Sequence, residues 1–137
     1  MTVAVVSDRF AVAPQLEPGD LPALAEAGYR TLICNRPDGE ESDQPSAGTM
    51  RAAAESAGMA FHHIPVSGGV FPDEAIAAFA KVRDEAEGKV LAYCRTGTRS
   101  ITLDALANSD CLGGAELIER ARTAGYDLSA LSPRLGT

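Results

Sequence analysis

The sequence predicts a single α/β domain over residues 1–137, in which a central, mostly parallel sheet is covered by helices on both faces. Short apolar runs alternate with helix-like segments along the chain, and this alternation is typical of parallel strands joined by crossover helices. No internal repeat, low-complexity tract or interdomain linker interrupts the order. A chain of 137 residues is also the size of one ordinary domain that can bury a hydrophobic core.

The N-terminal part of the chain predicts two short strands and a helix. Residues 3–6 and 9–13 are apolar runs on either side of a polar Ser-Asp pair, and we expect both to be strands. Residues 19–27 favour a helix, because Asp20 can act as its N-cap and Gly28 follows as a typical helix stop.

The middle of the chain predicts two further strands around a second helix. The run YRTLIC at residues 29–34 has the composition of a buried strand, and a polar loop that starts at Asn35 follows it. Residues 46–57 suit a helix that Gly58 ends, and residues 59–66 are expected to form the next strand. Because ligands bind at the carboxyl ends of parallel strands, the residues that follow each strand are candidates for the site.

The C-terminal half predicts one long helix, the last strand and three further helices. Residues 73–87 have apolar side chains at helical spacing, and Gly88 separates them from the strand at residues 89–93. The remaining helices are expected at residues 100–107, at residues 114–124 and within the tail 126–135.

The charge and the cysteine content argue against several classes of protein. The net charge is −7 and the isoelectric point is near 4.7. A general nucleic-acid or membrane-surface binder needs a basic face and is not expected, although a small basic pocket is compatible with these values. Three cysteines, an odd number, do not suit a disulfide framework. No signal peptide or membrane span is visible, so we expect a protein of the reducing cytoplasm whose Cys94 stays a free thiol.

A cysteine ends the last strand and precedes a helix in the segment KVLAYCRTGTRSI, residues 89–101. A helix N-terminus and nearby arginines favour the reactive thiolate. Arg99 offers a planar, permanently charged fork for an oxyanion, and the hydroxyl of Ser100 can donate to the sulfur. Gly97 allows the loop to turn its amides toward one centre. We therefore predict three catalytic residues, Cys94, Arg99 and Ser100, and an anion-binding loop of Arg95, Thr96, Gly97 and Thr98.

A buried structural cysteine followed by an ordinary polar turn is the alternative interpretation of this segment. The strand before Cys94, the glycine in the loop, the Arg-Ser pair and the helix beyond all agree with a nucleophile in an anion-binding loop, and this agreement favours function. No metal ion and no cofactor are expected. The adjacent His62 and His63 face opposite sides of their strand, and further ligands at suitable spacing are lacking.

Four segments of the chain resemble one bacterial family. They are GYRTLICNRPDGEE at residues 28–41, FHHIPVSGG at 61–69, VLAYCRTGTRS at 90–100 and AGYDLSAL at 124–131. They resemble the family named for the phosphatase-like domain of beta-lactamase hydrolase-like proteins, which is also catalogued as a sulfur transferase family. The resemblance implies a cysteine-phosphatase-like fold of the dual-specificity phosphatase type, with Cys94 as nucleophile and Arg99 as oxyanion ligand. It also matches residues 35–40, an Asn-Arg-Pro-Asp-x-Glu segment whose role it leaves open.

Three departures from the phosphatase pattern favour sulfur chemistry. Four residues separate Cys94 from Arg99, as in many rhodaneses and one fewer than in phosphatases of this fold, and a smaller ring suits a sulfur atom or a small oxyanion. Tyr93 stands where phosphatases usually carry a histidine. The loop PVSGG lacks the aspartate that those enzymes use as general acid, and a phosphate ester with a poor leaving group needs that proton.

We therefore expect a cysteine-dependent sulfurtransferase that passes a sulfane sulfur through a Cys94 persulfide in a ping-pong reaction. Its expected partners are a small-molecule anion or sulfane-sulfur donor and a thiol acceptor, with a persulfide-oxidising enzyme as a further candidate and with no nucleic acid and no membrane. The first alternative is a cysteine-dependent phosphatase of small or aryl phosphates that works through a phosphocysteine. The second is a non-catalytic module that binds an anion or a persulfide.

Three residues are accessory candidates, each with a plainer alternative. Arg36 adds positive charge over the anion-binding loop, or it forms a salt bridge with Glu40 or Glu41. Cys34 resolves an oxidised or persulfidated catalytic thiol, or it is a small buried apolar residue. Asp73 replaces the missing acid, or it caps the helix that follows it.

Overall fold

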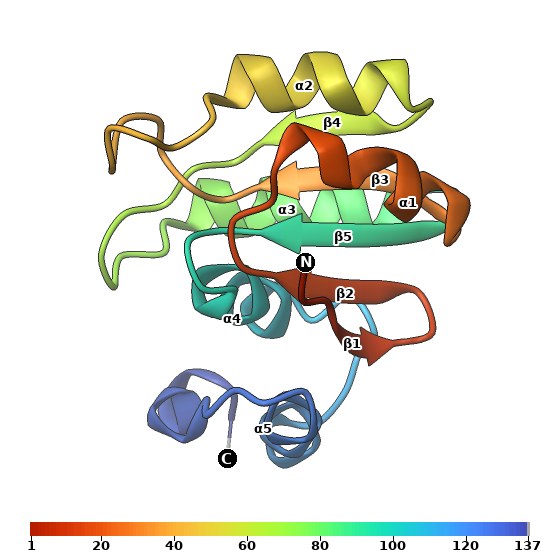
Figure 1. The fold of residues 1–137 in the computed structure, drawn as a ribbon. Helices are drawn as coiled ribbons and strands as arrows, with labels where there is room; N and C mark the ends of the chain where they lie inside the picture. The colour runs from red at the N-terminus through yellow and green to blue at the C-terminus, as the bar shows by residue number, and fades with distance from the viewer. Residues whose placement is uncertain (137) are drawn as a thin grey trace.

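The computed structural model describes residues 1–136 and contains one five-stranded sheet (Figure 1). Its strands are β1 (Ala4–Ser7), β2 (Phe10–Ala13), β3 (Tyr29–Cys34), β4 (Ala60–His63) and β5 (Lys89–Tyr93). The spatial order is β1-β2-β5-β3-β4. Strand β1 pairs antiparallel with β2, whereas β2, β5, β3 and β4 run parallel to one another. The prediction of a mostly parallel sheet is therefore confirmed, with β1 as its antiparallel edge.

The helices correspond to the predicted segments. They are α1 (Leu21–Glu26), α2 (Ala47–Ser56), α3 (Asp73–Glu85), α4 (Thr98–Ala107) and α5 (Gly114–Thr123), with the short 3-10 helices η1 (Pro18–Asp20) and η2 (Ser129–Arg134). Helix α4 begins earlier than predicted because Gly97, with φ 97°, forms the turn that starts it. Strand β4 ends earlier than predicted, although the amides of Ile64 and Val66 still donate to carbonyls at the end of β3 and just after it. Within residues 1–136 no helix has the length and apolar composition of a membrane span.

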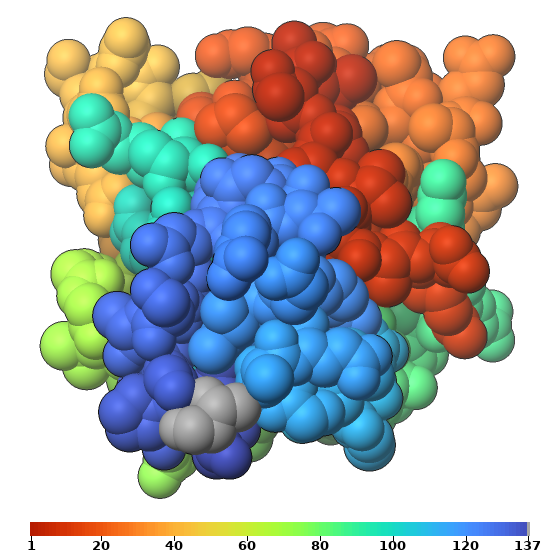
Figure 2. Space-filling view, turned by 90° about the horizontal axis from the view of Figure 1, so that it is seen from below, coloured from red at the N-terminus to blue at the C-terminus, as the bar shows by residue number. Residues whose placement is uncertain are grey.

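Helices cover both faces of the sheet and divide the core in two. Helices α1 and α2 lie on one face, whereas α3, α4 and α5 lie on the other (Figure 1). Figure 2 shows the C-terminal residues, in blue, beside the N-terminal residues, in red. The first core includes Leu21, Leu24, Leu32, Met50 and Leu91, and the second includes Val12, Ile33, Phe79, Leu103 and Leu128.

The predicted cap Asp20 does not act as expected, whereas Ser46, for which no capping role was predicted, caps the next helix. Asp20 does not cap α1 with its side chain. Its carboxylate accepts a hydrogen bond from the amide of Glu17 at 2.8 Å and so closes the turn η1 that precedes α1. Ser46, at the start of the helix predicted over residues 46–57, caps α2, because its hydroxyl oxygen accepts from the amide of Thr49 at 3.1 Å. Both arrangements satisfy amides that a helix start leaves unpaired.

The parallel strands end at the same edge of the sheet. Ala13 of β2 and Cys34 of β3 both lie opposite Tyr93, the last residue of β5. The loops that follow β3, β4 and β5 therefore meet there, at the left of Figure 1. Cys94 is the next residue after β5, so the topology places the predicted nucleophile at the ligand-binding edge of the sheet.

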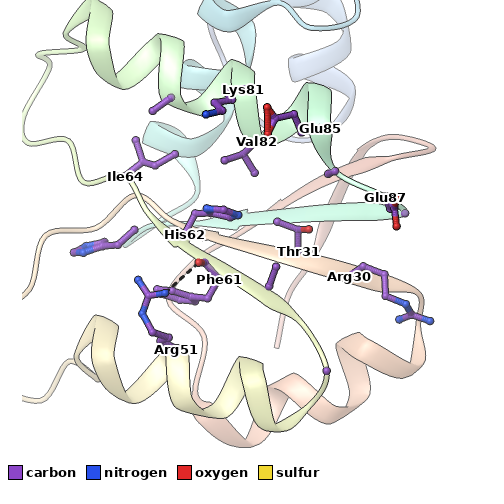
Figure 3. A pocket seen from close by; sticks show the side chains of 16 residues that line it. Arg30, Thr31, Arg51, Phe61, His62, Ile64, Lys81, Val82, Glu85 and Glu87 are labelled. Atoms are coloured by element: carbon purple, nitrogen blue, oxygen red, sulfur yellow. Dashed lines mark hydrogen bonds between the residues drawn. The ribbon is translucent and has the colours of Figure 1, made fainter.

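A wide hollow of about 1230 Å³ lies along the open edge strand β4 (Figure 3), and no residue of the anion-binding loop lines it. His62 and His63 both line it, and Nε2 of His63 also lies 2.9 Å from the carbonyl oxygen of Arg36. Arg51 donates to the carbonyl of Phe61 at 3.3 Å and lies over its ring. A charged side chain over an edge strand opposes pairing with another chain.

Candidate active site

Cys94 is a free thiol that is completely buried at the base of the anion-binding loop. Its sulfur accepts a hydrogen bond from the amide of Gly97, with an N–Sγ distance of 3.1 Å. A hydrogen bond donated to sulfur stabilises the thiolate more than the thiol. Gly97 also precedes the first residue of α4, so the positive end of the helix dipole acts in the same direction.

Arg99 lies in the first turn of α4 and is held by a bidentate ion pair with Glu40. Its Nη1 and Nη2 donate to the two carboxylate oxygens at 2.8 and 2.9 Å, and Nη1 also donates to the carbonyl of Val66 at 2.8 Å. This pairing, together with the negative charge of Cys94, raises the pKa of Arg99. The same hydrogen bonds lower the pKa of Glu40 to about 2. Glu40 is therefore a carboxylate at neutral pH that orients the guanidinium group.

Arg36 forms the predicted salt bridges with Glu40 and Glu41 and also lies at the hollow over the anion-binding loop. Its Nε and Nη2 donate to Glu40 and Glu41, each at 2.9 Å, and Nη1 donates to Gln15 at 3.0 Å. The side chain is only 3% exposed, yet it also lines the hollow over the anion-binding loop. Arg95 donates to the same Glu41 oxygen at 3.0 Å from the outer side. The loop after β3 thus brings one arginine and two glutamates to the site.

A second hollow, of about 660 Å³, lies over the anion-binding loop. Its charged lining consists of three arginines and two glutamates, which leave one net positive charge. A net charge this low attracts distant anions only weakly. The hollow therefore suits a small anion that forms close hydrogen bonds with the arginines. Within residues 1–136 no three His, Cys, Asp or Glu side chains are placed to hold a metal ion. The lining residues are Arg36, Glu40, Glu41, Gly68, Arg95, Thr96, Thr98 and Arg99.

Ser100 does not donate to the Cys94 sulfur, contrary to the prediction. Its hydroxyl donates to Oδ1 of Asn35 at 2.8 Å, and both residues are completely buried. Asn35 donates in turn from Nδ2 to the carbonyl of Ile64 at 2.9 Å and from its amide to the carbonyl of Tyr93 at 2.8 Å. Asn35 therefore ties the loops after β3, β4 and β5 to α4. The family resemblance includes Asn35 in its match at residues 35–40, but a single asparagine after a strand does not indicate this role.

Neither Cys34 nor Asp73 lines the hollow over the anion-binding loop. Cys34 is buried in the core under α1 and α2, where its thiol donates to the carbonyl of Arg36 at 3.4 Å and burial raises its pKa. This environment fits a small buried residue better than a resolving thiol. Asp73 is exposed in the first turn of α3 and does not cap it, because the N-cap residue is Pro72.

Glu40→Gln is expected to lower turnover of an anionic substrate. Glutamine cannot balance the guanidinium charge, so Arg99 loses its fixed orientation and kcat/KM should fall on the order of tenfold. Because the pKa of Glu40 is lowered from 4.5 to about 2, its stabilisation of the fold is complete above about pH 4.5 and is lost as the pH falls through about 2. The free energies of unfolding of the unaltered protein and of Glu40→Gln are measured in urea. Their difference should be constant at neutral pH and shrink in acid.

Glu41→Gln is the matched control for Glu40→Gln, because it removes the same charge from the hollow without touching Arg99. Glu41 contacts Arg36 and Arg95 instead. We expect this control to keep its turnover and to bind anions slightly more tightly. Equal losses of kcat/KM in the two variants would mean that Glu40 acts through its charge alone and not by orienting Arg99.

Parallel strands between two layers of helices, with a cysteine where β5 ends and an arginine in the helix turn that follows, define the class of cysteine-phosphatase-like α/β proteins. The sequence agrees with this class. The family model for the phosphatase-like domain of beta-lactamase hydrolase-like proteins matches residues 2–111. The chain belongs to this family.

Curated and solved relatives support the same assignment. A beta-lactamase hydrolase-like protein of Agrobacterium fabrum is 37% identical over 134 residues, which cover 95% of this chain but 31% of that protein. The chain thus spans about a third of the length of this curated relative. A solved protein of Neisseria meningitidis Z2491, provisionally assigned as a phosphatase, is 36% identical with a TM-score of 0.86 over 98% of this chain and 96% of its own. The core catalytic domain of a PP-IP phosphatase from S. cerevisiae, 13% identical, shares the fold, with a TM-score of 0.67 over 90% of this chain and 75% of its own.

These comparisons confirm the expected family and the fold, and they support an enzyme of the hydrolase type. They favour the phosphatase alternative, and the preference for a sulfurtransferase receives no specific support from them. The four-residue spacing between Cys94 and Arg99 occurs here in a phosphatase-like family, so this spacing alone does not identify sulfur chemistry.

Proposed function

We propose that this chain is a cysteine-dependent phosphatase of small phosphate monoesters with acidic leaving groups, such as aryl phosphates. One observation carries the proposal: the buried Cys94 sulfur accepts the Gly97 amide at the base of the anion-binding loop, while Arg99, in the first turn of α4, lines the hollow of net positive charge over that loop. A nucleophile and an oxyanion ligand in one loop suit attack on a tetrahedral anion. Membership of a phosphatase-like family supports the same choice.

The reaction would proceed through a phosphocysteine. The Cys94 thiolate attacks phosphorus, an S–P bond forms, and the P–O bond to the leaving group breaks, so the aryl oxide departs with the electron pair. Arg99 and the loop amides stabilise the charge on the phosphoryl oxygens during this step. Water then attacks phosphorus and the S–P bond breaks, which releases inorganic phosphate and a proton and restores the thiolate.

The leaving group must be acidic because of the ionisation of Glu40 in the hollow. Glu40 forms ion pairs with Arg36 and Arg99, and its pKa is lowered to about 2. A carboxyl group in this state has no proton to donate at neutral pH. The leaving group must therefore depart as an anion, which aryl oxides do readily and alkoxides do not.

A series of phosphate monoesters with leaving groups of different pKa tests the proposal. We expect p-nitrophenyl phosphate to be hydrolysed. Alkyl phosphates should react more slowly by roughly 10²–10⁴-fold, which is the contribution that a positioned general acid makes. The measurement is kcat/KM against the pKa of the leaving group. A flat dependence would mean that an acid serves the site, and no hydrolysis of any ester would refute phosphatase activity.

Sulfur transfer is the second candidate, and the short ring between Cys94 and Arg99 is the observation that favours it. The thiolate would attack the outer sulfur of thiosulfate, release sulfite as the S–S bond breaks, and pass the sulfur of the resulting persulfide to a thiol. Intact mass after brief incubation with thiosulfate separates the candidates. A gain of one sulfur atom without aryl-phosphate hydrolysis would make this the function of the site.

A further inference from the structure

The peptide group between Thr96 and Gly97 makes hydrogen bonds on both of its sides. Its carbonyl oxygen accepts from the hydroxyl of Tyr126 at 2.9 Å, and its N–H donates to the Cys94 sulfur at 3.1 Å. A planar trans peptide directs its C=O and N–H in opposite directions. A group that holds the carbonyl therefore also determines where the N–H points.

Tyr126 is itself held in place beside the loop. Gly125, with φ 100°, ends α5, and the amide of Tyr126 donates to the carbonyl of Ala121 at 2.9 Å. The ring packs so closely on Gly97 that a Cβ at that position would overlap the hydroxyl and lie 2.9 Å from Cζ. Burial and, to a smaller extent, the negative charge of Cys94 raise the pKa of Tyr126, so its hydroxyl keeps its proton and stays a donor.

We propose that Tyr126 is a positioning residue, which directs the Gly97 N–H at the Cys94 sulfur through the Thr96–Gly97 peptide group and so favours the thiolate. Hydrogen bonds at the two ends of one peptide group polarise it and strengthen each other. Tyr126 lies in AGYDLSAL, residues 124–131, one of the segments that resemble the family, and C-terminal to residues 2–111, which the family model matches. The inference deepens the proposed function, but it concerns the thiol itself and needs no substrate for its test.

Tyr126→Phe tests this inference, because it removes the hydroxyl and keeps the ring on Gly97. The readout is the ultraviolet absorbance of the thiolate as a function of pH, corrected with Cys94→Ser so that the other thiols cancel. We expect the midpoint of this titration to rise by about half to one pH unit. Tyr29→Phe is the matched control and should leave the midpoint unchanged, since Tyr29 lies opposite Lys89 at the other end of the sheet.

An unchanged midpoint in folded Tyr126→Phe would overturn the inference. Should that variant fail to fold, Cys94→Ser provides a second test, because the coupling is reciprocal and loss of the sulfur charge should lower the pH at which Tyr126 ionises. This ionisation can be followed by NMR of ring-labelled tyrosine, and no change would equally refute the coupling. A shifted midpoint without hydrolysis of aryl phosphates would uphold the role of Tyr126 and refute only the phosphatase.

Discussion

Cys94→Ser is expected to abolish hydrolysis of aryl phosphates and to leave the binding of inorganic phosphate nearly unchanged. The serine hydroxyl is far less acidic than a thiol, so the loss in kcat should be on the order of 10³-fold or more. The groups that would bind an anion, the loop amides and Arg99, are all retained. Phosphate binding is measured by calorimetry and turnover with p-nitrophenyl phosphate.

Cys111→Ser is the matched control for Cys94→Ser, because Cys111 is an exposed thiol outside the anion-binding loop. It should hydrolyse the substrate at the original rate. Retained turnover in Cys94→Ser would exclude this thiol as the nucleophile. Phosphate binding without turnover in the unaltered protein would instead support the non-catalytic, anion-binding module.

Asp104→Ala is expected to cause the largest loss of stability, about 3–5 kcal/mol. The Asp104 side chain is 2% exposed and accepts from Nε of Arg83, itself 5% exposed, at 2.7 Å. Burial raises the pKa of Asp104, and the charge of Arg83 opposes that shift. Each charge therefore offsets part of the cost of burying the other. Without the carboxylate, Arg83 keeps a buried charge over the ring of Phe10 with much of its compensation gone. Urea denaturation measures the difference.

Asp110→Ala is the matched control for Asp104→Ala, because it removes another carboxylate bound to Arg83. The Asp110 side chain is 34% exposed, so we expect its loss to lower the free energy of unfolding by less than about 1 kcal/mol. Replacing both Arg83 and Asp104 by apolar residues of similar volume should come close to restoring stability. Equal losses in the two single variants would contradict the role assigned to the buried pair.

Much of the fold and part of the site could be predicted from the sequence because their signals are local. Glycines after helical segments located the helix ends, and the apolar runs located all five strands. The anion-binding loop was recognisable because Cys94, Gly97 and Arg99 lie within six consecutive residues. Parallel strands then placed this loop at the correct edge of the sheet.

The remaining parts of the site depend on contacts between distant segments, which carry no local signal. Arg99 and Glu40 are 59 residues apart in the sequence, and Ser100 and Asn35 are 65 apart. The hydroxyl of Ser100 was predicted at the sulfur because it lies near it along the chain, but Asn35 competes for it from another loop. The burial of Asp104 could not be predicted for the same reason, because it depends on the packing of α3 and α5 against α4.

The two edges of the sheet bear on how this domain can be combined with others. One edge, β4, is four residues long and carries Arg51 over Phe61, and the other, β1, is an equally short antiparallel strand. Neither edge offers a long, unprotected template for a foreign strand. The same domain makes up nearly all of one solved chain and about a third of a curated relative. A sheet whose two edges are short, one of them guarded by a charged side chain, is suited to being joined to further domains as a module, because its edges discourage pairing with neighbouring sheets.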